Sequence, residues 1–402
     1  MVEKFEFKII KKDKKTQARL GIIKTKHGAV NTPYLIPVAT TAVVKSLDSR
    51  DLENMDIQCV LANTYHLSLR PGDKIIKKAG GLHKFMSFNK PIFTDSGGFQ
   101  AFSLGYGLEH NISKIGGFFP KENLMNEKNK AGKNLAKITD KGVSFKSVYD
   151  GSTQFISPKI SMQIQSNLGA DIIMAFDECT SPLHNHDYTK RSLERTNKWL
   201  VESLKYRNKK QAIYGIIQGG EFKDLRIESA KFVNSLPFEG IAIGGALGKS
   251  KKTMNDVLDW VIPITNYKKP RHMLGIGEIE DIFNCVERGI DTFDCVNPTR
   301  IARKGNLYIL PKSGGRIKNG FRIRLKNSAF KNDFSPIDKN CNCSTCKKYS
   351  KAYLRHLCMV QDQSYARLAT IHNIQFILNL MKSIREAIAE NQFSKLKKSW
   401  LK

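Results

Sequence analysis

A carboxylate followed by two arginines marks residues 289–303 as a candidate for chemistry. The first half of this segment is apolar in the manner of a short buried strand, and Asp294 stands where such a strand would leave the core. A carboxylate in that place must be paired, hydrogen-bonded or catalytic, because burying an unpaired charge is costly. Arg300 and Arg303 follow closely, and guanidinium groups suit phosphate. The segment predicts a phosphate-bearing substrate brought up to a nucleophile or base.

A second carboxylate, Asp95, ends another apolar run and is followed by Ser96 and two glycines. Two carboxylates that face one bond can divide the labour, one attacking an anomeric carbon while the other handles protons. Asp95 and Asp294 are therefore a candidate catalytic pair. Their spacing alone fits equally two carboxylates that cap turns.

Two further polar residues end strongly apolar runs, Asp177 after residues 172–176 and Gln218 after residues 212–217. A carboxylate and an amide at the bottom of one pocket could read the Watson–Crick edge of a purine. The alternative is that Asp177 pairs with a neighbouring basic group. Phe99 could stack on a base or belong to the core.

Three cysteines within six residues, Cys341, Cys343 and Cys346, with His372 further on, have the types and number of ligands of a structural zinc site. Four protein ligands leave no open position for water, so we assign this metal to folding. His356 is the nearest alternative ligand. The other five cysteines are interpreted as core thiols of a protein from a reducing compartment.

The elements that must position these residues recur along the chain. Eight short apolar runs alternate with amphipathic segments, and near-continuous apolar strands followed by helices are typical of a parallel (β/α)8 barrel. A doubly wound open sheet is the second choice. The carboxylates, the amide and the glycines stand at the ends of these runs, which in a barrel meet on one face. The runs cover residues 34–39, 58–64, 91–96, 171–178, 212–219, 240–245, 272–277 and 289–296.

The composition favours a polyanionic partner. The chain has 402 residues, with 66 Lys and Arg against 37 Asp and Glu, and a formal charge of +29. Such an excess indicates nucleic acid before acidic lipid, although an AT-biased genome could also raise the lysine content. There is neither an apolar stretch of membrane-spanning length nor the apolar core of a signal peptide at the start, so we expect a cytoplasmic protein.

Five motifs together resemble the tRNA-guanine transglycosylases, or queuine tRNA-ribosyltransferases, of the bacterial type. They are FTDSGGFQ at 93–100, MAFDECT at 174–180, GIIQGG at 215–220, ERGIDTFDCVNPTR at 287–300, and the cysteine cluster with His372. The resemblance extends from about residue 5 to about residue 395. It implies an irregular (β/α)8 TIM barrel with a C-terminal zinc-binding subdomain inserted before the last barrel helix.

The resemblance implies a role for each matching residue. Asp294 looks like the nucleophile that attacks the ribose, and Asp95 like the general acid and base. The base-binding set would be Ser96, Phe99, Gln100, Asp177, Gln218 and Gly245, with Phe99 as the stacking face. Arg300 and Arg303 would grip the anticodon loop. The zinc ligands would be Cys341, Cys343, Cys346 and His372.

The implied reaction exchanges guanine at the wobble position of tRNAs with a GUN anticodon for 7-aminomethyl-7-deazaguanine, a precursor of queuosine. The family also implies a homodimer. We expect a catalytic barrel at 1–304 with a mobile insertion at 108–139, a zinc-binding subdomain at 305–372, and a C-terminal helix at 373–402 that completes the barrel. The loop at 244–250 departs from the family pattern, which keeps a non-catalytic tRNA-binding paralogue or partner subunit as the alternative.

Overall fold

Eight parallel strands form a closed barrel in the computed structural model, which describes residues 5–102, 136–147, 149–245 and 250–402. Their hydrogen-bonded order is β10-β11-β12-β13-β14-β4-β5-β6. Each predicted apolar run contributes one of these strands, which confirms the barrel. The strands are β4 (Tyr34–Ala39), β5 (Val60–Ala62), β6 (Ile92–Thr94), β10 (Ile172–Met174), β11 (Ala212–Ile217), β12 (Gly240–Ile243), β13 (Arg271–Met273) and β14 (Thr292–Cys295).

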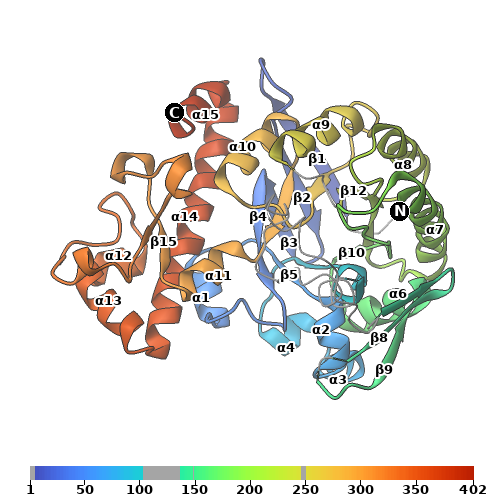
Figure 1. Cartoon of the computed structure of the whole chain (residues 1–402), viewed down its shortest axis with the longest axis horizontal. Coiled ribbons are helices and arrows are strands. Elements are labelled where there is room, and N and C mark those ends of the chain that lie inside the picture. Colours follow the sequence, from blue (N-terminus) through green and yellow to red (C-terminus); the bar gives the residue numbers. More distant parts are fainter. Residues whose placement is uncertain (1–4, 103–135, 148, 246–249) are drawn as a thin grey trace. The chain divides into compact units, whose positions relative to one another are not determined.

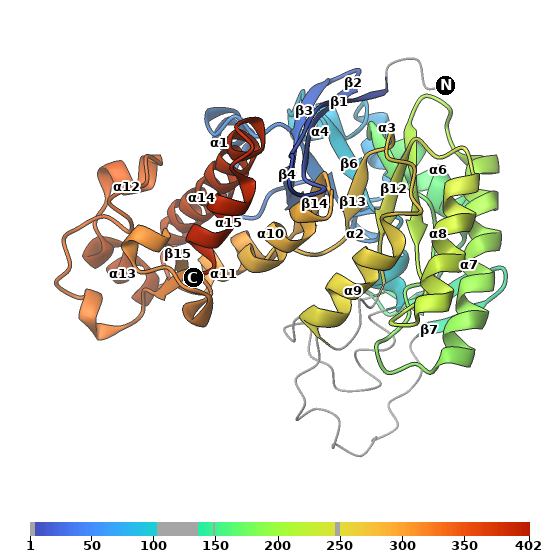
Figure 2. The same ribbon diagram turned by 90° about the horizontal axis from the view of Figure 1, so that it is seen from above.

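Helices follow most strands, and α7 and α8 pack against β11 (Figure 2). Helices α3 and α4 are separate, because Gly80 and Gly81 between them adopt positive φ angles of 92° and 88°. The helices are α1 (Ser49–Asn54), α2 (Thr64–Leu69), α3 (Asp73–Lys78), α4 (Leu82–Met86), α6 (Pro158–Leu168), α7 (His186–Tyr206), α8 (Lys223–Ser235), α9 (Lys251–Val261) and α10 (Ile279–Glu287).

The chain divides into two compact units, each built from several segments. The first unit comprises Met1–Phe7, Ile23–Ala29 and Leu61–Leu274, and the second comprises Lys8–Ile22, Val30–Val60 and Gly275–Lys402. The N-terminal strands β1 (Glu6–Lys12), β2 (Arg19–Thr25) and β3 (Gly28–Thr32) form a separate sheet in that order. Within the described residues, no helix is both long enough and apolar enough to cross a membrane.

In the first unit, a buried glutamine completes the seam between β6 and β10, whose pairing is registered only at Ile172 and Phe93. Gln165 of α6 is fully buried. Its Oε1 accepts from the Thr94 hydroxyl at 2.9 Å and from the Met174 amide at 3.1 Å, while its Nε2 donates to the Met174 carbonyl at 2.9 Å. The side chain thus satisfies backbone groups that a neighbouring strand would otherwise pair.

The start of the same seam is held by Asp171, which is nearly fully buried. One oxygen accepts from the Ile92 amide at 3.0 Å and lies 3.1 Å from His83 Nε2, and the other lies 2.7 Å from His27 Nδ1. Burial is the largest single effect and raises the pKa of Asp171, but these partners together outweigh it, so the pKa is lowered. The centroids of the two imidazole rings are 3.6 Å apart, so the rings stack on each other while both hydrogen-bond to the same carboxylate. We therefore interpret the cluster as structural.

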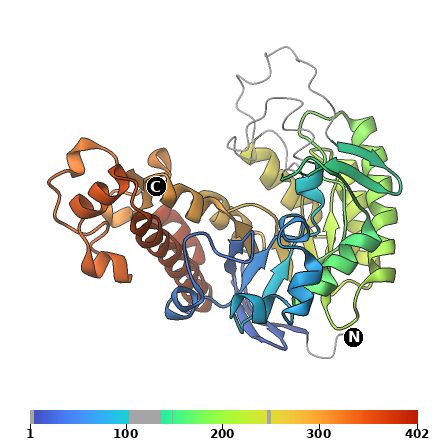
Figure 3. The ribbon, with the colours of Figure 1, turned by 90° about the horizontal axis from the view of Figure 1, so that it is seen from below.

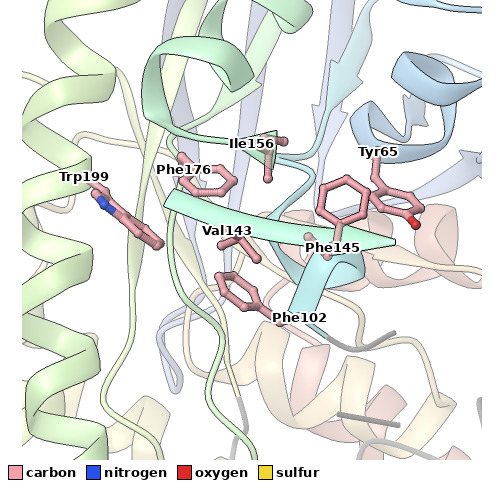
Figure 4. Close-up of a cluster of buried hydrophobic side chains, with 8 residues drawn as sticks. Tyr65, Phe102, Val143, Phe145, Ile156, Phe176 and Trp199 are labelled. Carbon is pink, nitrogen blue, oxygen red and sulfur yellow. The ribbon is translucent and has the colours of Figure 1, made fainter. Parts of the chain in front are cut away.

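A three-stranded antiparallel sheet covers a hydrophobic cluster beside the end of β10. It consists of β7 (Ala136–Thr139), β8 (Gly142–Lys146) and β9 (Thr153–Ile156). Figure 4 shows Val143 and Phe145 of β8 among Phe102, Phe176 and Trp199. Residues 136–139, predicted to belong to the mobile insertion, are strand β7, and residues 108–135 of that insertion lie outside the described residues. The cluster makes an apolar wall next to the residue that follows Phe176.

In the second unit, the long helix α14 (Gln363–Ala389) organises the C-terminal region (Figures 1 and 3). It packs against β4 and against helices α11, α12, α13 and α15. His372 lies inside this helix, and a further helix, α15, follows it, so residues 373–402 are not one helix. The remaining elements are α11 (Asn297–Arg303), β15 (Asn306–Tyr308), β16 (Arg322–Arg324), α12 (Ser344–Lys348), α13 (Lys351–Met359), α15 (Phe393–Trp400) and the 3-10 helices Pro311–Ser313, Ile317–Asn319 and Ser328–Phe330.

Asn373, the neighbour of His372, joins three parts of this unit. Its Oδ1 accepts from the Tyr308 amide at 3.0 Å, and its Nδ2 donates to the carbonyls of Pro298 and Asn306, each at 3.1 Å. The strands β15 and β16 are antiparallel. A fully buried amide with all three bonds made ties α14 to the segment that follows Asp294.

Candidate functional site

Asp95 follows the last residue of β6, and donors from the ends of β5 and β6 hold its carboxylate. The Thr64 amide donates to Oδ1 at 2.8 Å and the Gly97 amide at 3.2 Å. The other oxygen, Oδ2, accepts from the side-chain Nδ2 of Asn63 and from Gln100 Nε2, the latter at 3.3 Å. The residue is half-buried. Its carboxylate therefore has a fixed orientation while remaining reachable, which suits a group that exchanges protons with a bound molecule.

Asp177 lies three residues past the end of β10 and is buried, with 5% of its surface exposed. The Ser96 hydroxyl donates to Oδ1 at 3.0 Å and Gln218 Nε2 donates to Oδ2 at 2.5 Å. Burial raises the pKa of Asp177 to about 6, although both hydrogen bonds act in the opposite direction. The partners in the structure are thus a hydroxyl and an amide, not the basic group of the alternative interpretation.

Gln218 presents an acceptor beside Asp177. Its Oε1 is buried and has no hydrogen-bond partner among the described residues. Gly245 closes the other side, with φ at +80°, and a Cβ built there would lie 2.0 Å from that oxygen. Any side chain at position 245 would displace the amide of Gln218, so glycine is required on both conformational and steric grounds. A carboxylate and a carbonyl oxygen are together a fitting pair of acceptors for the N–H groups of a purine.

Phe99 lies next to this site and has 48% of its surface exposed. The structure therefore excludes the interpretation of Phe99 as a core residue. A partly exposed aromatic ring beside the site is of a type that can stack on a planar ligand. Residues 246–249, which carry most of the departure from the family pattern, lie outside the described residues.

Asp294 belongs to the second unit. It is a half-buried residue of β14 and is paired in register with Ile36 of β4. The amide of Gly275 donates to Oδ1 at 3.0 Å. Asp291, which precedes β14, is fully buried, in contrast to Asp294. Both of its oxygens are bound by Arg19, whose Nε donates to Oδ1 at 2.9 Å and whose Nη2 donates to Oδ2 at 2.5 Å. Of the two carboxylates, Asp291 is structural and Asp294 is the reachable one.

Helix α11 begins directly after β14 and carries both predicted arginines. Pro298 stands in its first turn, where a missing amide proton costs nothing. Arg300 is half-buried and Arg303 is exposed. Arg303 Nη1 donates to the carbonyl of Thr299 at 2.9 Å, which holds its guanidinium along the helix.

The cysteine cluster and His372 form a buried site that fits a tetrahedral metal. The four ligand atoms lie within 4.8 Å of one another, and His372 Nδ1 is 3.7, 3.6 and 3.3 Å from the sulfurs of Cys341, Cys343 and Cys346. A tetrahedral ion with metal–sulfur and metal–nitrogen bonds of about 2.3 and 2.0 Å would separate sulfur and nitrogen by roughly 3.5 Å. The exposed residue His356 is not in the cluster, so His372 is the residue placed to supply the fourth ligand.

The surroundings of His372 also show which of its ring nitrogens carries the proton. Nε2 lies 2.7 Å from the carbonyl oxygen of Tyr308, to which only a protonated nitrogen can donate. The proton is therefore on Nε2, and Nδ1 has its lone pair free for a metal. This arrangement of His372 within α14 links the cluster to β15.

Several residues of the site were not predicted for the roles they have. Asn63 and Thr64 hold the Asp95 carboxylate, and Gly275 holds that of Asp294, although nothing in their local sequence predicts these contacts. Hydrogen bonds such as Thr64 N to Asp95 link residues 31 positions apart, and no local pattern records them.

Comparison with known proteins decides the family. The sequence profile described as Queuine tRNA-ribosyltransferase matches residues 13–402. The chain belongs to this family. A protein of Archaeoglobus fulgidus is 54% identical over 387 residues, covering 95% of this chain and 96% of its own length. Proteins named queuine tRNA-ribosyltransferase from Caldanaerobacter subterraneus and Roseiflexus sp. are 44% and 42% identical, each covering at least 97% of both chains.

Membership in the queuine tRNA-ribosyltransferase family makes this chain a pentosyltransferase that modifies tRNA. The matched residues 13–402 include all eight barrel strands and the cysteine cluster with His372. The resemblance found in the sequence motifs is confirmed.

Proposed function

We propose that this enzyme exchanges guanine at the wobble position of GUN-anticodon tRNAs for a 7-deazaguanine, 7-aminomethyl-7-deazaguanine, in queuosine biosynthesis. The observation that carries the proposal is the buried carboxylate of Asp177 beside the unpartnered oxygen of Gln218 and the close backbone of Gly245. Guanine and 7-deazaguanines share the N–H groups at N1 and on the exocyclic amine. A pocket that accepts from these groups therefore takes both bases and rejects adenine.

The chemistry proceeds by two displacements. An oxygen of Asp294 attacks C1′ of the ribose, the C1′–N9 bond breaks, and guanine leaves with that electron pair on N9. Asp95 supplies the proton that the leaving base takes up. It then takes the N9 proton from the incoming base, whose N9 attacks C1′ and displaces Asp294. Two inversions retain the configuration, and the RNA backbone is never cut.

The surroundings of Asp177 support base binding in this pocket. The apolar cluster that contains Phe145, Phe176 and Trp199 (Figure 4) lies beside Asp177, which follows Phe176 directly in the chain. Apolar side chains exclude water that would compete with a base for the acceptors of Asp177 and Gln218. Phe99 is proposed as the stacking face, with Ser96 and Gln100 as neighbours in the base site.

The tRNA would be held by charge and by the arginines of α11. The net charge of +29 supplies an affinity that falls with salt, as for other proteins that bind phosphate backbones. Arg300 and Arg303 follow the nucleophile directly and are proposed to bind phosphates of the anticodon loop. We place the reaction in the cytoplasm, where its tRNA substrate would be available.

The proposal is tested by base exchange in vitro. Radiolabelled guanine should enter a tRNA with a GUN anticodon, and unlabelled 7-aminomethyl-7-deazaguanine should release it irreversibly. A tRNA with another base at the wobble position serves as the control. Equal incorporation into both tRNAs would refute wobble-specific exchange, and no incorporation into either would favour a non-catalytic tRNA-binding protein.

Replacing Asp177 by Ala should impair base binding far more than tRNA binding. Two N–H groups of guanine would lose their acceptor in a buried pocket, a loss of about 3 kcal/mol or 100-fold in the KM for guanine. In the unaltered enzyme, Asp177 can accept hydrogen bonds from both N–H groups of guanine only when its carboxylate is ionised. The kcat/KM for guanine should therefore fall as the pH drops below about 6 and reach a plateau above it. Steady-state kinetics from pH 5 to 8 measure both effects. A variant with unchanged guanine KM would remove Asp177 from the base site.

We further propose that the metal is one structural Zn2+ and that the chain forms a homodimer. Three sulfurs and one imidazole favour Zn2+ over harder ions. For the dimer, an exposed aromatic patch in the second unit is the proposed contact. It comprises Phe334, with 80% of its surface exposed, and the stacked rings of Tyr349 and Tyr353. A large exposed apolar patch is typical of an interaction surface.

Analytical ultracentrifugation tests the dimer. Tyr353→Ala should weaken self-association at least tenfold, while Tyr267→Ala, which removes a tyrosine of similar exposure in the first unit, should leave it unchanged. A monomeric wild type at micromolar concentration would contradict the proposal. Equal effects of the two substitutions would instead exclude the aromatic patch as the contact.

A further inference from the structure

Helix α8 sends two side chains back to the end of β11. The hydroxyl oxygen of Ser229 accepts from the amide of Gln218 at 3.0 Å. Arg226, one turn earlier, is fully buried and directs its guanidinium to the same place. Both side chains therefore contact the backbone that carries the amide of the base pocket.

The guanidinium of Arg226 binds three carbonyl oxygens from two loops. Nε donates to Gly220 at 2.7 Å, and Nη1 donates to Ile217 at 3.1 Å and to Gly244 at 2.9 Å. Two of these acceptors flank Gln218, and the third precedes Gly245. A planar group with several fixed N–H directions can hold three acceptors at once, which an ammonium group at the same place would not match.

The residues around these loops are closely packed. A Cβ at Gly219 would lie 2.8 Å from the Arg226 amide nitrogen, and a Cβ at Gly245 would lie 2.0 Å from Gln218 Oε1. Gln218 and Gly245 are thus in close contact, and a shift of one loop against the other would change the acceptor geometry of the pocket directly. Misplacement by about 1 Å is enough to cost roughly two orders of magnitude in a reaction that depends on orientation.

The location of this buried cation argues for a role in the site. Burial lowers the pKa of Arg226 to about 10, so the group remains charged at neutral pH, and burying such a charge carries a cost. The carbonyls that it binds lie at the ligand-binding end of the strands. Arg271 offers the contrast, because it is also buried but starts β13 and donates from Nε to the Thr265 hydroxyl at 2.9 Å, at the opposite end of the strand.

We propose that Arg226 is a positioning residue for base selection, which sets the distance between Gln218 and Gly245 by clamping the loops after β11 and β12. The inference rests on the proposed function in so far as it takes this pocket to be the base site. Arg226 does not touch the base itself. Its loss should therefore weaken base binding while leaving the Asp294 chemistry and tRNA affinity nearly intact.

The test compares Arg226→Met, Arg226→Lys and the control Arg271→Met in the full-length protein. Guanine binding is measured by isothermal titration calorimetry, and exchange kinetics give kcat and the KM values for guanine and tRNA. We expect Arg226→Met to raise the Kd and KM for guanine at least tenfold, with kcat and the tRNA KM changed less than threefold. Arg226→Lys should lie in between. Arg271→Met should lower the melting temperature without changing the guanine Kd.

The other outcomes overturn the inference, the proposed function, or both. Wild-type guanine affinity in Arg226→Met, or equal loss of affinity in Arg226→Met and Arg271→Met, would make Arg226 merely structural. Should Arg226→Met fail to fold, unchanged guanine affinity in Arg226→Lys would serve the same purpose. A wild type that binds guanine without exchanging it would refute the proposed function alone, since the calorimetric comparison still applies. A wild type that binds no guanine would refute both.

Discussion

Asp294→Asn is expected to abolish base exchange, lowering kcat by at least about 10³-fold, because an amide oxygen does not form the glycosyl ester through which the reaction passes. The substitution preserves the size of the side chain and an oxygen that can accept from the Gly275 amide. It should therefore leave the fold and the tRNA affinity unchanged. The loss would then be confined to the chemical step.

The direct measurement is a covalent complex on a denaturing gel. Wild-type protein mixed with tRNA should give a band that survives denaturation and is dispersed by excess guanine, and Asp294→Asn should give none. The control is Glu287→Gln, which alters a nearby half-exposed carboxylate bound to Lys397 and should keep the band. A band of normal intensity in Asp294→Asn would remove Asp294 from its role. Full exchange activity in that variant would do the same.

Replacing one residue of the cysteine cluster with His372 is expected to disrupt the folding of the C-terminal region, which is the second large effect. Apparent binding free energies of structural zinc in small domains are about 10–16 kcal/mol, so a site reduced to three ligands should lose most of its metal. Cys343→Ala should lower the metal content from one ion per chain to near zero. It should also expose backbone amides between β15 and the start of α14 to hydrogen exchange. Chelation of the wild type should reproduce both effects.

Elemental analysis by mass spectrometry and hydrogen exchange measure this result. The matched control is Cys358→Ala, because Cys358 is a buried thiol of α13 outside the cluster. It should retain one metal ion. A soluble and active wild type that contains no metal would overturn the assignment, and an ion other than zinc would correct its identity while leaving the ligand set intact.

The barrel was accessible to prediction because its strands are local patterns. Strand β4 matches the predicted residues 34–39 in full, and β11 and β12 begin where the apolar runs begin. The ends were less accurate. The run at 171–178 was predicted as one strand, whereas β10 ends at Met174. Phe176 belongs to the apolar cluster, and its amide donates to the Ser203 hydroxyl at 3.0 Å instead of to a strand. Apolarity reports burial, and burial does not require a strand.

Some functional residues could likewise be predicted from the local sequence, and others could not. The metal ligands could be predicted because three cysteines in six residues have few other uses, and the structure brings them to His372 as expected. The clamp of Arg226 could not be predicted, since an arginine in the first half of an amphipathic helix is usually exposed. Its burial depends on the carbonyls that two separate loops turn towards it.

The order of amino acids by itself determined the eight strand–helix units, the metal ligands, and the carboxylates that stand at strand ends, because each depends on residue types at short spacing. Only the tertiary structure decided which polar groups meet. Asp177 receives Ser96 from 81 residues away and Gln218 from 41 residues away, and Gln218 keeps an oxygen free against Gly245. The reason is physical: a hydrogen bond is selected by distances of a few tenths of an ångström, and these arise from packing across the whole barrel.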